Sequence, residues 1–305
     1  AASLTGLPVT QNHFDLPVDA LGILRTDHPH YYRGKQGDES ETEFVDRIVG
    51  NLEALIIREG PDSIAAFIAE PITGASGVIV PPAGYYQKVQ AVLNRYGIMF
   101  WADEVITGFG RTGNDFGCTT MGIESPDMMT FAKQLSSAYM PISASAVRRD
   151  VYDAMIEQSA NAGAFGHGYT YSGHPVACAV ALKTLEIYQR DLIFEKAAVT
   201  GEYLQKRLAE FTDHPLVGEV RGIGLIGALE LVANKETGEA FVGGAVGGYA
   251  QKIAQDNGLL IRAVAGSSLG FCPPLIITTE QIDEMIEIVA IALDTTLAHC
   301  KKENL

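Results

Sequence analysis

Three short apolar segments of the chain each end abruptly at a charged side chain. They occupy residues 64–69, 100–102 and 127–132, and the charged residues that follow them are Glu70, Asp103 and Lys133. Short apolar runs bounded by Gly, Pro or Asp are typical of buried strands in a parallel sheet. The pattern therefore predicts three strands.

A helix is predicted between the first two strands, over residues 82–96, because apolar side chains recur there at helical spacing: Tyr85, Val89, Val92, Leu93 and Tyr96. A strand, a crossover helix and a second strand make the two strands parallel. Ligands of open α/β sheets bind outside the carboxyl ends of the strands. We therefore expect Glu70, Asp103 and Lys133 to gather at one crevice, although a lysine after a strand can also be a solvated charge, and Asp103 with Glu104 an ordinary start of a loop.

Further elements complete an α/β domain. Ser40 and Glu43 form a capping box before a helix that ends at Gly60. A strand over residues 141–147 and a short helix over 151–158 follow Lys133, and Pro175 suits the first turn of a helix that runs to Arg190. The loop between them, residues 163–175, is rich in glycine and hydroxyl groups, which favours either hydrogen bonding to a polar partner or simple solvation.

The pattern changes near residue 192 and predicts a smaller α+β domain. One helix is followed by two strands within residues 216–232, which we expect to turn at Arg221-Gly222, and later strands are predicted over 259–264 and 272–277. Thr278 and Gln281 form a second capping box before a long terminal helix. The domains are predicted as residues 1–192 and 193–305.

A glycine pattern in this second part matches the dinucleotide-binding fingerprint by its letters, over residues 222–227. The fingerprint requires a helix that opens at its last glycine, whereas residues 228–232 continue a strand pattern. We therefore reject a dinucleotide site.

Composition narrows the class of protein. The 305 residues are 47% hydrophobic and 19% charged, with a formal net charge of −15. This charge, without clustered Lys or Arg, argues against a nucleic-acid partner. We find no run of 18 apolar residues and no signal peptide at the start of the sequence, so we expect no membrane partner and a cytoplasmic location.

Cysteine and histidine give no clear metal or redox signal. The four cysteines are widely spaced, which favours free buried thiols over a disulfide framework or a zinc site: Cys118, Cys178, Cys272 and Cys300. His28 and His30 flank a proline, and without a third ligand they are more typical of a loop than of a metal site. We predict no metal.

Four motifs stand in order along the chain: Asp103 to Gly113, Pro126-Asp127, Ala132 to Ser137 and Gly168 to Pro175. In their order and spacing they resemble the class III pyridoxal-phosphate aminotransferases, and the resemblance is closest to the omega-transaminases (amine:pyruvate and beta-alanine:pyruvate transaminases). The resemblance covers essentially the whole chain. It implies a fold-type I enzyme, with a mostly parallel sheet flanked by helices and a smaller α+β C-terminal domain, that is an obligate dimer with active sites at the subunit interface.

The resemblance also implies roles for individual residues. Lys133 matches the lysine that holds pyridoxal 5'-phosphate as a Schiff base, and Asp103 matches the partner of the pyridine nitrogen. Val105 matches the residue packed on the cofactor ring, Glu70 an active-site glutamate, and Thr170 a phosphate ligand donated by the other subunit. The chemistry requires the same residue types, since a lysine amine can exchange a Schiff base and move a proton, and a carboxylate keeps the ring nitrogen protonated.

Arg262 lies where omega-transaminases carry an arginine for the substrate carboxylate. A guanidinium can bind a carboxylate through two hydrogen bonds or move to solvent when an apolar group arrives, and the alternative is a structural ion pair. The expected function is transfer of an amino group from an amine or omega-amino acid donor to a keto acid, pyruvate.

The sequence also departs from the family. The Gly-Ser phosphate cradle and the stacking aromatic residue of the family are not found, so the chain resembles the C-terminal two-thirds of a member. A second departure is Ala265-Gly266, where relatives often have Gly-Asp. The alternatives are an aminomutase or decarboxylase on the same scaffold, or an inactive, cofactor-poor truncated form.

Overall fold

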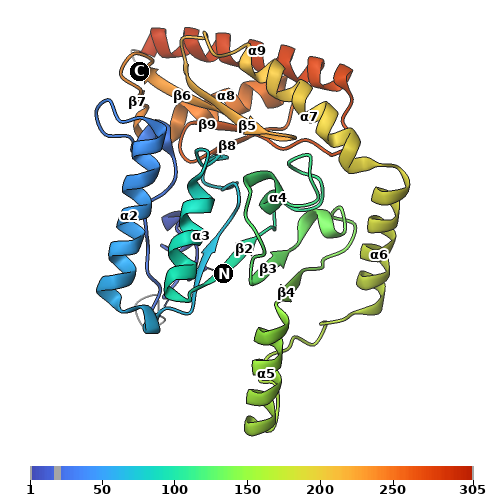
Figure 1. The fold of residues 1–305 in the computed structure, drawn as a ribbon. Helices are drawn as coiled ribbons and strands as arrows, with labels where there is room; N and C mark the ends of the chain where they lie inside the picture. Colours follow the sequence, from blue (N-terminus) through green and yellow to red (C-terminus); the bar gives the residue numbers. More distant parts are fainter. Residues whose placement is uncertain (1, 17–21, 304–305) are drawn as a thin grey trace.

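The computed structural model describes residues 2–16 and 22–303 and contains two sheets, each covered by helices (Figure 1). The first sheet has the strand order β1-β2-β3-β4. Its strands are β1 (Ala66–Ala69), β2 (Met99–Asp103), β3 (Met128–Phe131) and β4 (Ala144–Val147). β1, β2 and β3 run parallel, and β4 pairs with β3 in the antiparallel sense. The three parallel strands predicted from the apolar segments are confirmed.

Two helices pack on this first sheet and form a core with it. The crossover helix between β1 and β2 is α3 (Tyr85–Tyr96), and α2 (Glu41–Glu59) lies beside it (Figure 1). The capping box of α2 is present, because the Glu43 N–H donates to Ser40 Oγ and the Ser40 N–H donates to the Glu43 carboxylate. The apolar faces of both helices bury against β2, where Phe100 and Ala102 are fully enclosed. This core holds the carboxyl ends of the strands in place.

The chain after β4 extends away from the rest of the molecule. The helix α5 (Arg149–Ala162) points away from the first sheet (Figure 1). It is longer than the predicted 151–158 and has no buried residue. It is followed by an exposed loop and by α6 (Pro175–Arg190), whose predicted bounds are confirmed. Among the described residues, the remaining short helices of the first part are η1 (Pro8–Thr10), α1 (Tyr31–Gly34), η3 (Pro61–Ser63), α4 (Gly117–Met121) and η4 (Lys133–Leu135).

The second sheet is antiparallel and has the order β5-β6-β9-β8, with β7 paired to β6. Its strands are β5 (Val217–Ile223), β6 (Ile226–Asn234), β7 (Glu239–Ala240), β8 (Arg262–Val264) and β9 (Ser268–Phe271). It is covered by α7 (Ile193–Ala209), α8 (Ala245–Asp256) and α9 (Thr279–Glu303), with the short η5 (Val242–Gly244) before α8 (Figure 1). The capping box that opens α9 is confirmed, since Thr278 and Gln281 exchange their hydrogen bonds.

Two sequence predictions in this second part are wrong. The turn between β5 and β6 lies at Gly224-Leu225 and not at Arg221-Gly222, because Gly224 takes the positive φ of 57° that the turn requires. Residues 272–277 form no strand; two successive prolines, Pro273 and Pro274, have no N–H to donate to a neighbouring strand. The rejection of a dinucleotide fingerprint is confirmed, because residues 222–227 form a β-hairpin.

A glycine-rich turn after β2, residues 108–113, packs directly against the second part of the chain. A Cβ on Gly110 would lie 2.4 Å from the Phe194 ring, so only glycine allows this approach. The buried Arg111 Nη1 donates to the carbonyls of Leu225, at 2.9 Å, and Pro273, at 2.5 Å. The two sheets therefore share a tightly packed boundary, and the division at residue 192 stays a prediction.

Candidate active site

Three polar side chains predicted for the site stand at the carboxyl ends of adjacent parallel strands. Ala69 is in register with Ala102, so Glu70 and Asp103 follow neighbouring positions, and Asp103 is in register with Thr130, shortly before Lys133. The charges of Asp103 and Lys133 are both close enough to Glu70 to change the pKa of its carboxyl group. The structure thus brings Glu70, Asp103 and Lys133 together at one edge of the sheet.

The Glu70 side chain is largely buried and is held by the turn that follows it. Its Oε2 accepts a hydrogen bond of 2.9 Å from the Gly74 N–H, and its backbone carbonyl accepts one of 2.5 Å from the Tyr86 hydroxyl. Burial has the largest effect and raises the pKa of the Glu70 carboxyl, and the Asp103 charge raises it further. The Gly74 N–H and the Lys133 charge lower the pKa. The net pKa of Glu70 lies above the ordinary value. Glu70 is therefore a carboxyl group that takes up a proton more easily than usual.

The adjacent carboxylates Asp103 and Glu104 have different environments. Asp103 is half-buried, and its Oδ1 accepts from the Val105 N–H at 3.0 Å. The Glu104 side chain is 0% exposed and accepts from Thr107 Oγ1 and from the N–H groups of Gly117 and Cys118 at the start of α4. Glu104 thus anchors the turn, while Asp103 remains at the strand end with one local contact.

The lysine of the predicted site lies in a strained turn. Lys133 has a φ of +45°, and Ser137 and Ala138 in the same turn also have positive φ. Such conformations are costly for residues with a Cβ and cluster at functional sites. The turn is held by the Tyr188 hydroxyl, which donates to the Gln134 carbonyl at 2.9 Å. The Lys133 side chain is exposed and forms no ion pair with any described carboxylate, so its amine is accessible.

Two further predicted site residues, Thr170 and Arg262, come from other parts of the chain than the edge of the sheet that carries Glu70, Asp103 and Lys133. Thr170 is in the exposed loop after α5, and α5 begins from the opposite end of the sheet, where Arg148 pairs with Asp127 ahead of β3. Arg262 begins the edge strand β8 of the second sheet, paired in register with Gly270. Its guanidinium is exposed and forms no ion pair within residues 2–16 and 22–303. This weakens the alternative that Arg262 belongs to a structural ion pair.

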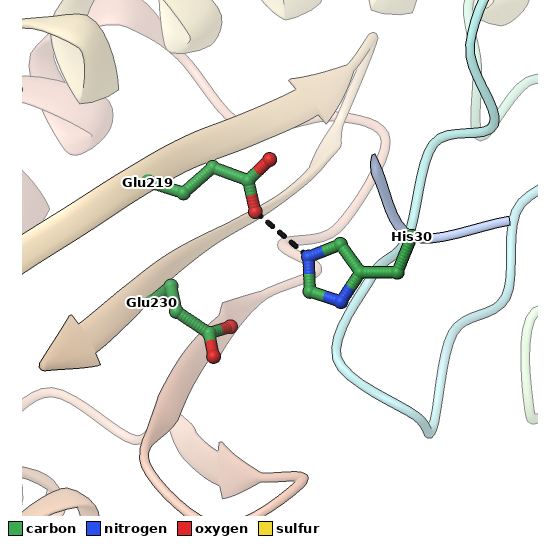
Figure 2. Close-up of side chains that lie close together, drawn as sticks. All are labelled: His30, Glu219 and Glu230. Carbon is green, nitrogen blue, oxygen red and sulfur yellow. Dashed lines mark hydrogen bonds and ion pairs between the residues drawn. The ribbon is translucent and has the colours of Figure 1, made fainter. Parts of the chain in front are cut away.

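A cluster of ionisable side chains joins the N-terminal segment to the second sheet. His30 Nε2 lies 2.9 Å from Glu219 Oε2, with Glu230 beside it (Figure 2). These three groups lie close enough to hold a metal ion. However, Glu219 pairs with Arg221 and Glu230 with both Arg221 and Arg33, so a cation would compete with two guanidinium groups for the same oxygens.

The cysteines are free, as expected, but they are not all buried. Cys118 and Cys300 are buried, Cys178 is half-buried and Cys272 is exposed. Burial raises the pKa of the Cys118 thiol, and the nearby Glu104 charge raises it further. Cys118 is therefore held as a neutral thiol in the core.

Sequence reasoning missed the residues that hold the site in shape. Gly74 and Tyr188 support Glu70 and the Lys133 turn, and Arg221 contacts the turn after Glu70 from the second sheet. The glycines of residues 74–77 were a visible signal for a turn that could approach a ligand. No sequence signal pointed to Arg221, whose partner Gly77 lies 144 positions away.

Comparison with known proteins assigns the chain to a family. Residues 20–293 match the aminotransferase class-III family, and the chain belongs to it. Gamma aminobutyrate transaminase 1, mitochondrial, of Solanum lycopersicum is 49% identical over 297 residues, and vanillin aminotransferase of Capsicum chinense is 44% identical over 297 residues. These alignments cover 97% of this chain but 57% and 64% of those proteins. The chain thus spans less than two thirds of the length of these curated relatives.

Solved structures give the same result. A transaminase with L-alanine superposes with a TM-score of 0.94 at 50% identity, over 98% of this chain and 70% of that one. The omega transaminase from Pseudomonas jessenii in complex with PMP gives 0.93 at 49% identity, over 97% of this chain and 64% of that one. The expected fold-type I α/β architecture of class III aminotransferases is confirmed. In the described ranges, no helix is both long and apolar enough to cross a membrane.

Proposed function

We propose that this chain forms part of a pyridoxal-phosphate-dependent transaminase, which transfers an amino group from an amine or omega-amino acid to a keto acid. Class III aminotransferases depend on this cofactor. The observation that carries the proposal is the accessible Lys133 amine in a strained turn, beside the carboxylates Glu70 and Asp103, in a chain of this family.

The side chains at the sheet edge fit the chemistry of the cofactor. Pyridoxal phosphate, when bound, supplies an aldehyde carbon that accepts an amine and a ring that accepts electrons. Lys133 would hold the aldehyde carbon, Asp103 the protonated ring nitrogen, and the partly exposed Val105 the face of the ring. Glu70 would border the ring, and Thr170 of a second copy would donate its hydroxyl to the phosphate.

Each side chain then has a defined task. The Lys133 amine, when neutral, would take a proton from the substrate carbon and pass it to the former aldehyde carbon of the cofactor, since a positioned amine is an effective general base. The Asp103 carboxylate would stabilise the positive charge at the ring nitrogen of the bound cofactor. The Glu70 carboxylate, held in place by the Gly74 N–H, would accept a hydrogen bond beside the ring.

A homodimer is part of the proposal. The helix α5 and the following loop expose large apolar side chains, with Tyr169 75% and Tyr171 78% exposed, and they border a groove of about 770 Å³ lined by Met155, Phe165 and neighbouring residues. Exposed apolar patches of this kind mark protein interfaces. A second copy of the chain would cover this surface and bring Thr170 to the site of its partner.

The finer assignments follow the same reasoning. We propose pyruvate as the acceptor and Arg262 as the group that binds its carboxylate, because this guanidinium is exposed without a described ion-pair partner. The relatives named gamma-aminobutyrate transaminases make an omega-amino acid a reasonable donor. An aminomutase, a decarboxylase and an inactive, cofactor-poor form are alternatives that the test below separates from a transaminase. A cytoplasmic location remains part of the proposal, although the relatives include mitochondrial and chloroplastic proteins.

The proposal is tested by adding pyridoxal phosphate to the protein and recording the visible absorption band. Reduction with borohydride and peptide mapping should then place the label on Lys133. In Lys133→Ala the label and transamination should both be lost, whereas Lys183→Ala, which changes an exposed lysine on α6, should behave as the unmodified chain. A label on another lysine would refute the site, and a labelled protein that produces no amino acid from pyruvate would favour the alternatives.

A further inference from the structure

The turn that follows Glu70 is a compact structure with its own hydrogen bonds. Thr73 and Ile79 pair across it, with N–H to carbonyl distances of 3.1 Å and 2.9 Å. The N–H groups of Gly77 and Val78 both donate to the Gly74 carbonyl. The Gly74 N–H in turn donates to the Glu70 carboxylate. Glu70 is therefore held by the same turn that its own strand leads into.

The second sheet holds this turn from the other side. Arg221 on β5 is 8% exposed, and its Nε donates to the Gly77 carbonyl at 2.8 Å. A Cβ on Gly77, whose φ is +114°, would lie 2.9 Å from Arg221 Nη2 and 3.4 Å from the Ala265 Cβ. The turn thus fits closely against the second sheet. A side chain at position 77 would be strained by the positive φ and would have to displace the Arg221 guanidinium.

Arg221 is itself fixed by acidic partners. Its Nη1 lies 2.6 Å from Glu219 Oε2, and its Nη2 lies 2.7 Å from Glu230 Oε2 and 3.1 Å from Ser268 Oγ. All three guanidinium nitrogens are therefore engaged, and the planar geometry of the group fixes the direction of Nε towards Gly77. A lysine ammonium at the same place is a single point donor and would remain with the carboxylates.

We propose that Arg221 is a positioning residue that fixes the Glu70 carboxylate through the Gly74–Gly77 turn. The contact makes the position of Glu70 depend on the second sheet, so the two parts of the chain must be docked for Glu70 to be in place. The importance of this contact for the reaction rests on the proposed function, whereas the contact itself does not.

Hydrogen exchange of the cofactor-free chain tests the contact directly. In Arg221→Met, exchange at the amides of Gly74, Gly77 and Val78 should become about tenfold or more faster, the effect of losing one hydrogen bond from a charged donor. Exchange in β2 should stay unchanged. Arg33→Met is the matched control, because Arg33 donates to Glu230 from the same network but does not contact the turn.

Arg221→Lys keeps a positive charge between the two carboxylates and decides the test if Arg221→Met does not fold. It should also loosen the turn, whereas unchanged exchange in the turn of a folded variant would refute the proposal. Equal loosening in Arg33→Met would refute it as well, because it would indicate general destabilisation.

A second measurement uses the cofactor-loaded enzyme. The Gly74 N–H lowers the pKa of Glu70, so a loosened turn should raise that pKa and move the acid limb of the pH–rate profile to higher pH. Faster exchange with an unchanged profile would refute the positioning role. If the unmodified chain binds no cofactor, the proposed function fails, and the exchange experiment alone still decides whether Arg221 holds the turn.

Discussion

The replacement of Glu104 by glutamine tests whether Glu104 stabilises the fold while the adjacent Asp103 serves the reaction. In the structure the Glu104 Oε2 accepts from Thr107 Oγ1 at 2.5 Å and from the Gly117 N–H at 2.9 Å, and the Oε1 accepts from the Cys118 N–H at 2.7 Å. A glutamine has one acceptor oxygen and one NH₂ donor. In its better orientation, the NH₂ group faces the Cys118 N–H, and this donor loses its partner.

The size of the effect follows from these contacts. A buried donor left unsatisfied costs about 1–3 kcal/mol, and the two remaining hydrogen bonds lose their charge assistance. Removal of a buried charge offsets part of this loss. We expect Glu104→Gln to lower the free energy of unfolding by about 2 kcal/mol.

Asp103→Asn serves as the matched comparison. The asparagine oxygen can still accept from the Val105 N–H, so stability should change by less than about 0.5 kcal/mol. Turnover should fall about 10³-fold, because an amide does not stabilise a protonated ring nitrogen.

Urea unfolding of both cofactor-free variants and turnover of both loaded variants provide the measurements. The reasoning is refuted if Glu104→Gln is as stable as the unmodified protein. It is also refuted if Asp103→Asn unfolds as easily as Glu104→Gln, or keeps full turnover.

Two further predictions concern charge at the site. Glu70→Gln should stabilise the cofactor-free protein at pH 8, because the raised pKa of Glu70 means that folding favours its neutral form and the carboxylate costs stability above the folded pKa. This gain should vanish below about pH 4.3, the ordinary glutamate pKa, as thermal unfolding at both pH values would reveal, and an equal gain at pH 4 would contradict the burial argument. Arg262→Ala should raise the KM for pyruvate by about 30-fold or more and change the half-reaction with a carboxylate-free amine little, with each half-reaction followed by the cofactor spectrum. Equal damage to both half-reactions would instead assign Arg262 to the fold.

Local patterns in the sequence determined the elements that carry the site. The apolar runs before Glu70, Asp103 and Lys133, with a helical stripe between the first two, specify parallel strands whose carboxyl ends meet at one edge. Capping boxes at Ser40 and Thr278 specify helix starts. These predictions succeeded because each depends on neighbours within a few positions along the chain.

Only the tertiary structure decided what the individual polar groups do. Asp103 and Glu104 are adjacent and chemically alike, yet Glu104 is enclosed by the start of α4 and Asp103 is not. The turn after Glu70 depends on Arg221, a residue 144 positions beyond Gly77. The bend between β5 and β6 likewise lies at Gly224, where the chain packs on Thr112 of the first part. Burial and hydrogen bonding between distant segments set these outcomes, and such contacts leave no periodic pattern in the sequence.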